Sequence, residues 1–357
     1  MNTRISSILT TAAAVLATAL TGCSNPAAAP PSTSAPTTAP TTATASGGAG
    51  ATGSAPANPA PKIAVAQIVT HPSLDAIRNG FETCLRGLGY TGASFDEQNP
   101  QGDQAALTGI AGTFKSGRYD LVVAITTPVA QAFAQAMTDR PIIFAGVTDP
   151  VSAGLVNSFA SPGGNLTGTS DYPPIDDQIQ LIKDIVPTAK TIGVVYASSE
   201  SNAEAQLNLA KAAAAKLGLE VKAAAVTNSS EIGQAATSLA GVDAFYVGND
   251  NTVVSGVEAL VQAATTQRVP VIAADPDSVK RGATASYAID QTEMGCQAAT
   301  LADKVLRGAS PATLPVIKMA DLTGALALTI NPTAAAAAGV TIPAAVSSRP
   351  GTVVVGA

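Results

Sequence analysis

The sequence of 357 residues is 46% hydrophobic and only 12% charged, which is enough apolar material for two compact units rather than one. The formal net charge of −6, with no stretch rich in Lys and Arg, argues against binding to nucleic acid or to an anionic membrane surface. Tryptophan is absent and aromatic residues make up 4% of the chain, so any stacking platform would depend on a few Tyr and Phe side chains.

The first 22 residues are predicted to be a signal peptide. The basic start MNTR precedes the apolar stretch ISSILTTAAAVLATAL, which is shorter than the roughly 20 residues needed to span a bilayer. The stretch is followed by Thr-Gly-Cys, and LTGC is similar to the bacterial lipobox, in which the cysteine is acylated. We expect Cys23 to anchor the mature chain at the extracytoplasmic face of the bacterial cell membrane through lipid alone. The alternative is a plain secretory signal in which Cys23 is incidental.

Residues 23–61, the lipid-bearing cysteine and the segment that follows it, consist almost entirely of Ala, Pro, Thr, Ser and Gly. Such a segment has no large apolar side chain to bury, so it is predicted to be a disordered tether. Its reach is roughly 35 Å if it behaves as a flexible coil, which would hold a folded part at some distance from the anchor.

From residue 62 onward, β-branched runs alternate with Ala-rich helical segments. The runs include IAVAQIV at 63–69, LVVAI at 121–125 and TIGVVYA at 191–197. Near-continuous apolar strands separated by helices are typical of parallel sheets that are covered on both faces. The alternation occupies two blocks, 62–171 and 172–290, and predicts an α/β fold with two doubly wound parallel sheets.

Polar side chains stand at six junctions between a predicted strand and the next helix. Ligands of open α/β sheets bind beyond the carboxyl ends of the strands, so two such sheets facing each other would gather these side chains around one cleft. The candidate residues are Thr70, His71, Thr126, Thr127, Thr148, Asp149, Ser199, Glu200, Asn202, Asp250, Asn251 and Asp275. Most are also residue types preferred at helix N-termini, so helix capping alone is the alternative at any single junction.

Catalytic motifs are missing or occur in the wrong context. His71 is the one histidine and there is no CxxC pair, so a His-based metal cluster cannot form. The sequence has no GxSxG elbow and no Walker loop. Its two GxGxxG matches lie in the tether and between a helix and a strand, the reverse of the dinucleotide-binding order. We therefore expect a binding protein without metal or cofactor rather than an enzyme.

Nearly all of 62–345 resembles the ABC-transporter substrate-binding proteins of the tryptophan/tyrosine-type family, which have the type I periplasmic-binding fold. The resemblance is carried by IAVAQIVTHPSLDAIRNGF, FAGVTDPVSAGLV, NLTGTSDYPPIDDQIQLIKDIVP, SSESNAEAQ, GNDNTVVSGVEAL, DPDSVKRGATASYAIDQTEMG and INPTAAAAAGVTIP. Within these, TDPVSAGLV and NDNTVVS are not generic α/β sequence. The tether lies outside the family pattern, and GND at 248–250 and ESN at 200–202 only approximate it.

The resemblance implies a monomeric protein that captures a small molecule, an aromatic amino acid or a related compound, and delivers it to the permease and ATPase subunits of an ABC importer. Other functions stay open on the sequence alone. The ligand could be a sugar or a nucleoside, or the protein could sense its ligand for a signalling partner. A purely structural envelope lipoprotein would have no ligand, and the polar cleft argues against it.

The resemblance also implies two lobes that close about crossing segments near 169–172 and 289–292. Lobe 1 would comprise residues 62–171, completed by about 291–322. Lobe 2 would comprise residues 172–290, with 323–357 as its candidate completion. Tyr172, beside the first crossing, would either stack on an aromatic ligand or pack within the hinge.

An amino-acid ligand requires one site for its carboxylate and another for its ammonium group. We assign the carboxylate to helix N-terminal N–H groups and to the hydroxyls of Thr70, Thr126 and Thr127. Candidates for the ammonium group are Asp149, Glu200, Asp250 and Asp275. Asn202 and Asn251 could complete either set. His71 could donate to the carboxylate or contact the backbone at its junction.

Cys84 and Cys296 remain once Cys23 is assigned to the lipid. An exported chain meets an oxidising compartment, yet a disulfide and two buried thiols are both open on composition alone. In the fold that the resemblance implies, the first and last helices of lobe 1 share one face of the sheet. That arrangement favours a disulfide between Cys84 and Cys296.

Overall fold

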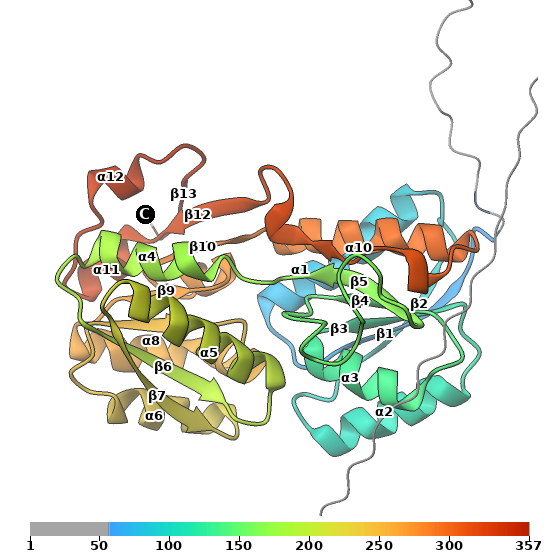
Figure 1. The fold of residues 1–357 in the computed structure, drawn as a ribbon, viewed down its shortest axis with the longest axis horizontal. Helices are drawn as coiled ribbons and strands as arrows, with labels where there is room; N and C mark the ends of the chain where they lie inside the picture. Colours follow the sequence, from blue (N-terminus) through green and yellow to red (C-terminus); the bar gives the residue numbers. More distant parts are fainter. Residues whose placement is uncertain (1–55, 57, 357) are drawn as a thin grey trace, which may run out of the picture. The chain divides into compact units, whose positions relative to one another are not determined.

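The structure is a computed structural model that describes residue 56 and residues 58–356, and these residues contain two β-sheets, one in each of two lobes (Figure 1). The predicted signal peptide, Cys23 and the tether up to residue 55 lie outside the described residues. Across the described part of the chain, no helix combines the length and the apolar character needed to cross a membrane.

Lobe 1 contains a six-stranded parallel sheet with the strand order β11-β5-β4-β3-β1-β2. The strands are β1 (Lys62–Gln67), β2 (Ser94–Gln98), β3 (Leu121–Ile125), β4 (Ile142–Ala145), β5 (Leu166–Ser170) and β11 (Ile317–Lys318). One face is covered by α1 (Pro72–Gly87) and α10 (Gln291–Leu306), and the other by α2 (Gln104–Ser116) and α3 (Thr127–Ala136) (Figure 1).

Lobe 2 contains a seven-stranded sheet with the order β13-β12-β10-β9-β8-β6-β7, in which only the β10–β12 pair is antiparallel. Its strands are β6 (Thr191–Ala197), β7 (Glu220–Val226), β8 (Ala244–Val247), β9 (Val271–Ala273), β10 (Ala285–Ile289), β12 (Leu326–Ile330) and β13 (Val353–Val354). Its helices are α4 (Ile175–Ile185), α5 (Ser201–Lys216), α6 (Ile232–Ser238), α7 (Asn251–Ser255), α8 (Val257–Gln267), α9 (Pro276–Lys280), α11 (Pro332–Ala337) and α12 (Ala344–Ser347). Single 3₁₀ turns occur at η1 (Ser229–Glu231), η2 (Pro311–Thr313) and η3 (Met319–Asp321).

The predicted α/β fold with two sheets is confirmed, and the reason is visible in the central strands. All five residues of β3 are buried, because its side chains point alternately to two faces that are both covered by helices. β3 and β6 coincide with the predicted runs LVVAI and TIGVVYA. One buried apolar cluster forms the core of lobe 1, and two clusters lie in lobe 2.

Within the residues that the structure describes, the chain crosses between the two lobes three times. β5 ends at Ser170 in the first sheet, and α4 then begins at Ile175 in lobe 2. β10 ends at Ile289, and α10 returns to pack against α1. The third crossing runs from β11 in one sheet to β12 in the other. These crossings place the carboxyl ends of the strands of both sheets on either side of a shared interface.

Helices α1 and α10 are in unusually close contact. A Cβ added to Gly80 would lie 2.3 Å from the carbonyl oxygen of Thr292, and one added to Gly295 would lie 2.1 Å from that of Ile77. A disulfide between Cys84 and Cys296 joins the same two helices. Since α1 begins at the interface between the lobes, this packing determines where its first residues lie.

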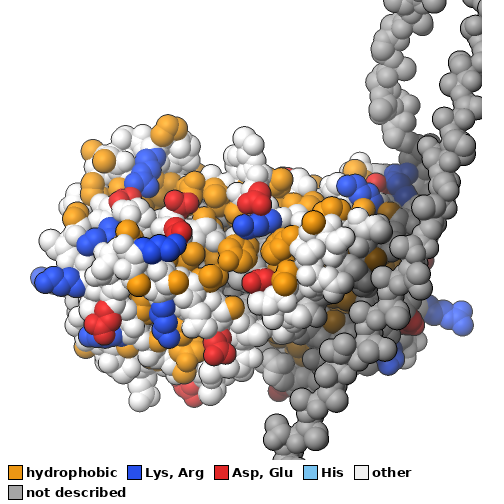
Figure 2. Space-filling view, viewed as in Figure 1, with side chains coloured by type: hydrophobic (Ala, Val, Ile, Leu, Met, Phe, Trp, Pro, Cys, Tyr) orange, Lys and Arg blue, Asp and Glu red, His pale blue; other side chains and the backbone are white. Residues whose placement is uncertain are grey.

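Charged side chains of both signs are interspersed over the face seen in Figure 2, with apolar side chains between them. Exposed ion pairs such as Lys216–Asp176, at 2.8 Å, belong to this kind of surface. Pairs in full contact with water contribute little to stability, so the fold depends on the buried clusters rather than on surface charge.

Candidate functional site

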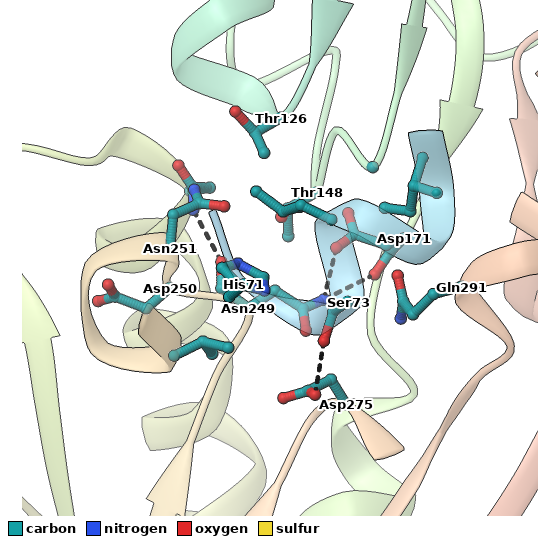
Figure 3. A pocket seen from close by; sticks show the side chains of 15 residues that line it. His71, Ser73, Thr126, Thr148, Asp171, Asn249, Asp250, Asn251, Asp275 and Gln291 are labelled. Atoms are coloured by element: carbon teal, nitrogen blue, oxygen red, sulfur yellow. Dashed lines mark hydrogen bonds between the residues drawn. The ribbon is translucent and has the colours of Figure 1, made fainter. Parts of the chain in front are cut away.

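A cavity lies between the lobes, where the carboxyl ends of strands from both sheets meet (Figure 3). Seven residues predicted from the sequence line it: His71, Thr126, Thr148, Asn202, Asp250, Asn251 and Asp275. The sequence analysis did not identify eight others: Ser73, Leu74, Ile77, Gly146, Asp171, Asn249, Val254 and Gln291. The described residues around this cavity include no Lys or Arg and no Phe or Tyr. The acidic side chains of the cavity therefore have no Lys or Arg partner among the residues that line it.

Three predicted residues lie outside this cavity because they have other partners. Thr70 is exposed, and its hydroxyl accepts hydrogen bonds from the side-chain amides of Asn99 and Gln101, both at 3.0 Å. Asp149 accepts from the backbone N–H groups of the two residues after Pro150, each at 3.1 Å. Tyr172 lines a separate hollow, and the ammonium nitrogen of Lys318 lies 4.6 Å from the centre of its ring.

Three further predicted residues are also displaced from the cavity. Thr127 is buried, and its hydroxyl accepts from the N–H of Thr148 at 3.3 Å. Ser199 and Glu200 line a neighbouring polar groove. Both oxygens of the Glu200 carboxylate are occupied, one by the N–H and hydroxyl of Thr252 and the other by Asn251. These six residues therefore lie outside the lining of the cavity.

Asp250 and Asp275 line the cavity, but their carboxylates serve as helix caps. Asp250 accepts from the N–H of Val253 at 2.9 Å, capping α7, and from the N–H of Ala197 at 2.6 Å. Asp275 accepts from the N–H of Ser278 at 2.8 Å, capping α9. Each carboxylate oxygen already has a partner within the chain, and the assignment of these two residues to a ligand ammonium group stays a prediction.

The two helices of lobe 1 that begin at the cavity are different, since neither has a side-chain cap. His71 stands at the N-terminus of α1 and Thr126 at that of α3, and neither side chain accepts from its helix. Helix capping, the alternative role at each junction, therefore does not apply to the side chain of Thr126. Two uncapped N-termini leave backbone N–H groups and positive partial charge at the same wall, where they favour an anion.

Four buried side chains at the cavity carry polar atoms that have no hydrogen-bond partner. These atoms are the hydroxyl of Thr126, both ring nitrogens of His71, Oδ1 of Asp171 and Oδ1 of Asn202. Unsatisfied polar atoms are costly in a protein interior, and several in one place indicate a ligand that supplies their partners. Thr126 also has a φ of +92°, a backbone conformation that is strained for a β-branched residue and typical of functional sites.

Asp171 belongs to the first crossing, and Asn249 at the end of β8 holds it in place. The side-chain amide of Asn249 donates to Oδ2 of Asp171 at 2.7 Å, which leaves Oδ1 free (Figure 3). Burial raises the pKa of Asp171 to about 6, while the nearby Thr148 hydroxyl and the Asn249 amide lower it by less. At neutral pH this side chain is therefore a buried carboxylate that lacks a cation.

Asn202 presents a second acceptor from α5. Its amide nitrogen donates to the backbone oxygen of Asn249 at 2.9 Å and to Glu200 at 3.3 Å. These two bonds determine the orientation of the amide, so its oxygen is the atom left without a partner. Two unpartnered acceptors therefore stand on the side of the cavity formed by the first crossing and lobe 2.

His71 is a neutral donor on lobe 1. Burial lowers the pKa of its imidazole below the usual value, although Asp275 and other nearby acids oppose this effect. A neutral imidazole has one N–H donor and one acceptor nitrogen. With the hydroxyl of Thr126 it gives lobe 1 two side-chain donors beside the free helix N–H groups.

The two lobes are in direct contact around the cavity. The Ser73 hydroxyl donates to Asp275 at 2.8 Å (Figure 3), and the Ser201 hydroxyl lies 3.2 Å from the side-chain oxygen of Gln131. Both bonds join a residue of lobe 1 to one of lobe 2. The two-lobed α/β fold, the three crossings and a polar cavity between the lobes define a solute-binding protein of the periplasmic-binding type.

Residues 62–354 match the family model described as ABC transporter substrate binding protein, so the chain belongs to that family, whose members are solute-binding proteins rather than enzymes. It is 43% identical over 258 residues to a tyrosine-binding protein of Clostridioides difficile, covering 71% of this chain and 75% of that protein. The predicted resemblance is confirmed by both comparisons.

Two solved structures share this fold over most of the chain. An ABC domain of Streptococcus pneumoniae in complex with L-Trp is 38% identical, with a TM-score of 0.78 over 82% of this chain and 99% of that one. A ligand-free, open substrate-binding protein of Clostridium difficile is 37% identical, with a TM-score of 0.63 over 83% and 99%. At nearly equal identity, this chain is therefore more similar overall to the L-Trp complex than to the ligand-free, open structure.

Proposed function

We propose that this protein binds a free aromatic α-amino acid in the cavity between its lobes. The observation that carries the proposal is that the unpartnered donors and the unpartnered acceptors belong to different parts of the protein. Donors from His71 and Thr126 stand on lobe 1, and acceptors from Asp171 and Asn202 stand on the first crossing and lobe 2. A zwitterion has a carboxylate for the donors and an ammonium group for the acceptors.

Helix N-termini strengthen the carboxylate assignment. The first turns of α1 and α3 have no side-chain cap and end at the cavity, so their N–H groups are available to the ligand. For the ammonium group, Asp171 supplies the charge and Asn202 a neutral oxygen. Asp171 takes over the role that the sequence had suggested for Asp250 and Asp275.

The ligand side chain would lie against aliphatic surface. Leu74 and Ile77 on α1 and Val254 on α7 are the larger apolar residues of the cavity. Leu74 and Ile77 are buried at 5% and 2% exposure, so their surfaces are held in place by the core of lobe 1. The names of the relatives, a tyrosine-binding protein and a domain in complex with L-Trp, support an aromatic side chain for the ligand.

Delivery to an ABC importer is the proposed role of the bound form. The family match supports this context, and the closed lobes would present one composite surface to the permease and its ATPase. We further propose that the protein acts as a monomer at the extracytoplasmic face of the membrane, anchored by lipid on Cys23. A ligand-sensing role for a signalling partner would use the same closure and is the alternative.

Binding of L-tryptophan and L-tyrosine, measured by isothermal titration calorimetry on protein stripped of carried-over ligand, tests the proposal. Two analogues separate the contacts: tryptamine lacks the carboxylate, and indole-3-propionate lacks the ammonium group. Each should bind at least about tenfold more weakly than L-tryptophan, since one buried charged group would lose its partner. Tight binding of a sugar or nucleoside, with no response to amino acids, would overturn the proposal.

A further inference from the structure

A continuous chain of buried hydrogen bonds runs through lobe 2 from the cavity to β10. The N–H of Asn249 donates to Oε1 of Gln206 at 2.7 Å, and Nε2 of Gln206 donates to the hydroxyl of Tyr246 at 2.8 Å. That hydroxyl donates to Oε1 of Gln178 at 2.6 Å, whose Nε2 donates to the carbonyl of Tyr287 at 2.9 Å. Gln178, Gln206 and Tyr246 are each 1% exposed, so water does not replace these bonds.

The direction of every bond in this chain is determined by its two ends. At one end the backbone carbonyl of Tyr287 can only accept, so Gln178 must turn its nitrogen toward it. At the other end the backbone N–H of Asn249 can only donate, so Gln206 must turn its oxygen toward it. The hydroxyl of Tyr246 joins the two amides, because it donates one proton and also accepts. Burial raises the pKa of the Tyr246 hydroxyl above its ordinary value, so the hydroxyl keeps its proton at neutral pH.

Asn249 is the residue through which this chain reaches the site. Its side chain holds Oδ2 of Asp171 at 2.7 Å, and its backbone oxygen holds the amide nitrogen of Asn202 at 2.9 Å. Both unpartnered acceptors at the cavity are therefore oriented by bonds to Asn249. The other end of the chain is on β10, which leads into the second crossing.

We infer that Tyr246 is a positioning residue for the ligand ammonium group, acting through Gln206 and Asn249 on Asp171 and Asn202. Without its hydroxyl, nothing prevents the Gln206 amide from rotating and placing its NH₂ group against the N–H of Asn249. Asn249 would then lose its fixed position at the end of β8. This inference rests on the proposed function, because it assumes that the ligand carries an ammonium group.

The variant Tyr246→Phe tests the inference, since it removes the hydroxyl and keeps the ring. The chain contains no tryptophan, so the indole of an added ligand can be followed by its own fluorescence without a protein signal at the same wavelength. The probes are L-tryptophan and indole-3-propionate. We expect the variant to bind L-tryptophan about five- to 30-fold more weakly than wild type, as for a lost buried hydrogen bond, and indole-3-propionate within about twofold.

Tyr90→Phe is the matched control. Tyr90 is also 1% exposed, and its hydroxyl donates to Asp303 at 3.0 Å in lobe 1, away from the cavity. It should leave the affinities for both probes unchanged. A second variant, Gln206→Met, breaks the chain one bond closer to Asn249 and should reproduce the selective loss, so the test does not depend on the folding of one variant.

Equal losses for both probes in Tyr246→Phe and Gln206→Met, or no loss for either probe, would overturn the positioning role. That result is distinguishable from a failure of the proposed function, which would appear in the wild type. If wild-type protein bound L-tryptophan no better than indole-3-propionate, ammonium recognition itself would be wrong and the inference would fall with it. If the wild type discriminates between the two probes and the variants discriminate equally well, only the positioning role of Tyr246 is contradicted.

Discussion

Replacing Asp171 by asparagine should stabilise the unliganded protein and weaken its binding of an amino acid, and both effects have one source. The Asp171 carboxylate is buried, and no Lys or Arg is found among the described residues around it in the cavity. Asparagine has nearly the same shape, and its carbonyl oxygen can keep the bond from Asn249. The substitution therefore removes a charge with little change in packing.

The magnitude for stability follows from the pKa of Asp171. Burial raises it from 3.8 to about 6 in the folded protein. A carboxyl whose pKa is raised by folding contributes its full stability to the folded state when the pH is below its unfolded pKa. This contribution is lost as the pH rises through its folded pKa. About two units at 1.36 kcal/mol each give roughly 3 kcal/mol at pH 7. The variant should avoid this loss and melt several degrees higher at pH 7.

The magnitude for binding follows from the lost charge. A hydrogen bond to a charged group contributes roughly 1.5–3 kcal/mol, so the affinity for L-tryptophan should fall about ten- to 150-fold. Calorimetric titration at neutral pH measures this. The difference in unfolding free energy between variant and wild type should be large at pH 7 and small near pH 4, where the wild-type carboxyl is also neutral.

Asp149→Asn is a suitable control, because Asp149 lies outside the cavity and caps its own loop. It should leave the affinity for L-tryptophan within about twofold of wild type. If Asp171→Asn bound L-tryptophan within about threefold of wild type, the assignment of Asp171 to the ammonium group would be refuted. An unfolding free energy that differs equally from wild type at both pH values would refute the argument from buried charge.

Three other substitutions test the framework of the site. Thr126→Gly should stabilise the unliganded protein by about 1 kcal/mol, because glycine adopts a φ of +92° without strain. The same substitution should lower the affinity for L-tryptophan about tenfold, and an unchanged affinity would exclude the Thr126 hydroxyl from the site. Gly295→Ala should cost about 1–3 kcal/mol in chemical denaturation, because its Cβ would lie 2.1 Å from the carbonyl oxygen of Ile77, and wild-type stability would contradict that contact. Serine at both Cys84 and Cys296 should cost about 2–5 kcal/mol, and a reductant should then destabilise the wild type but not the variant.

The architecture could be read from the sequence because it depends on local composition. Strands buried on both faces must be apolar throughout, so LVVAI and TIGVVYA identified β3 and β6 without reference to the rest of the chain. β2, with the sequence SFDEQ, was not among the predicted runs. It is an edge strand with no fully buried residue, and an edge strand needs no continuous apolar pattern.

The location of the site was also readable, because polar residues follow the buried strands and parallel strands end at the same edge of a sheet. Seven of the predicted residues line the cavity for this reason. Asp171 escaped notice because it lies in a crossing rather than at a strand–helix junction. Its position directly after the buried run LTGTS is the signal that could have revealed it.

The chemical role of each residue depended on partners that lie far away in the chain. Asp250 and Asn202 were equally plausible from the sequence, yet the structure shows that the Asp250 carboxylate is occupied by backbone N–H groups, while the Asn202 oxygen is free. Asp171 and Asn249 are 78 residues apart, and only the meeting of the first crossing with lobe 2 brings them together. Composition and periodicity therefore determined the sheets and the edge at which they bind, whereas tertiary contacts decided which polar atoms remain free for a ligand.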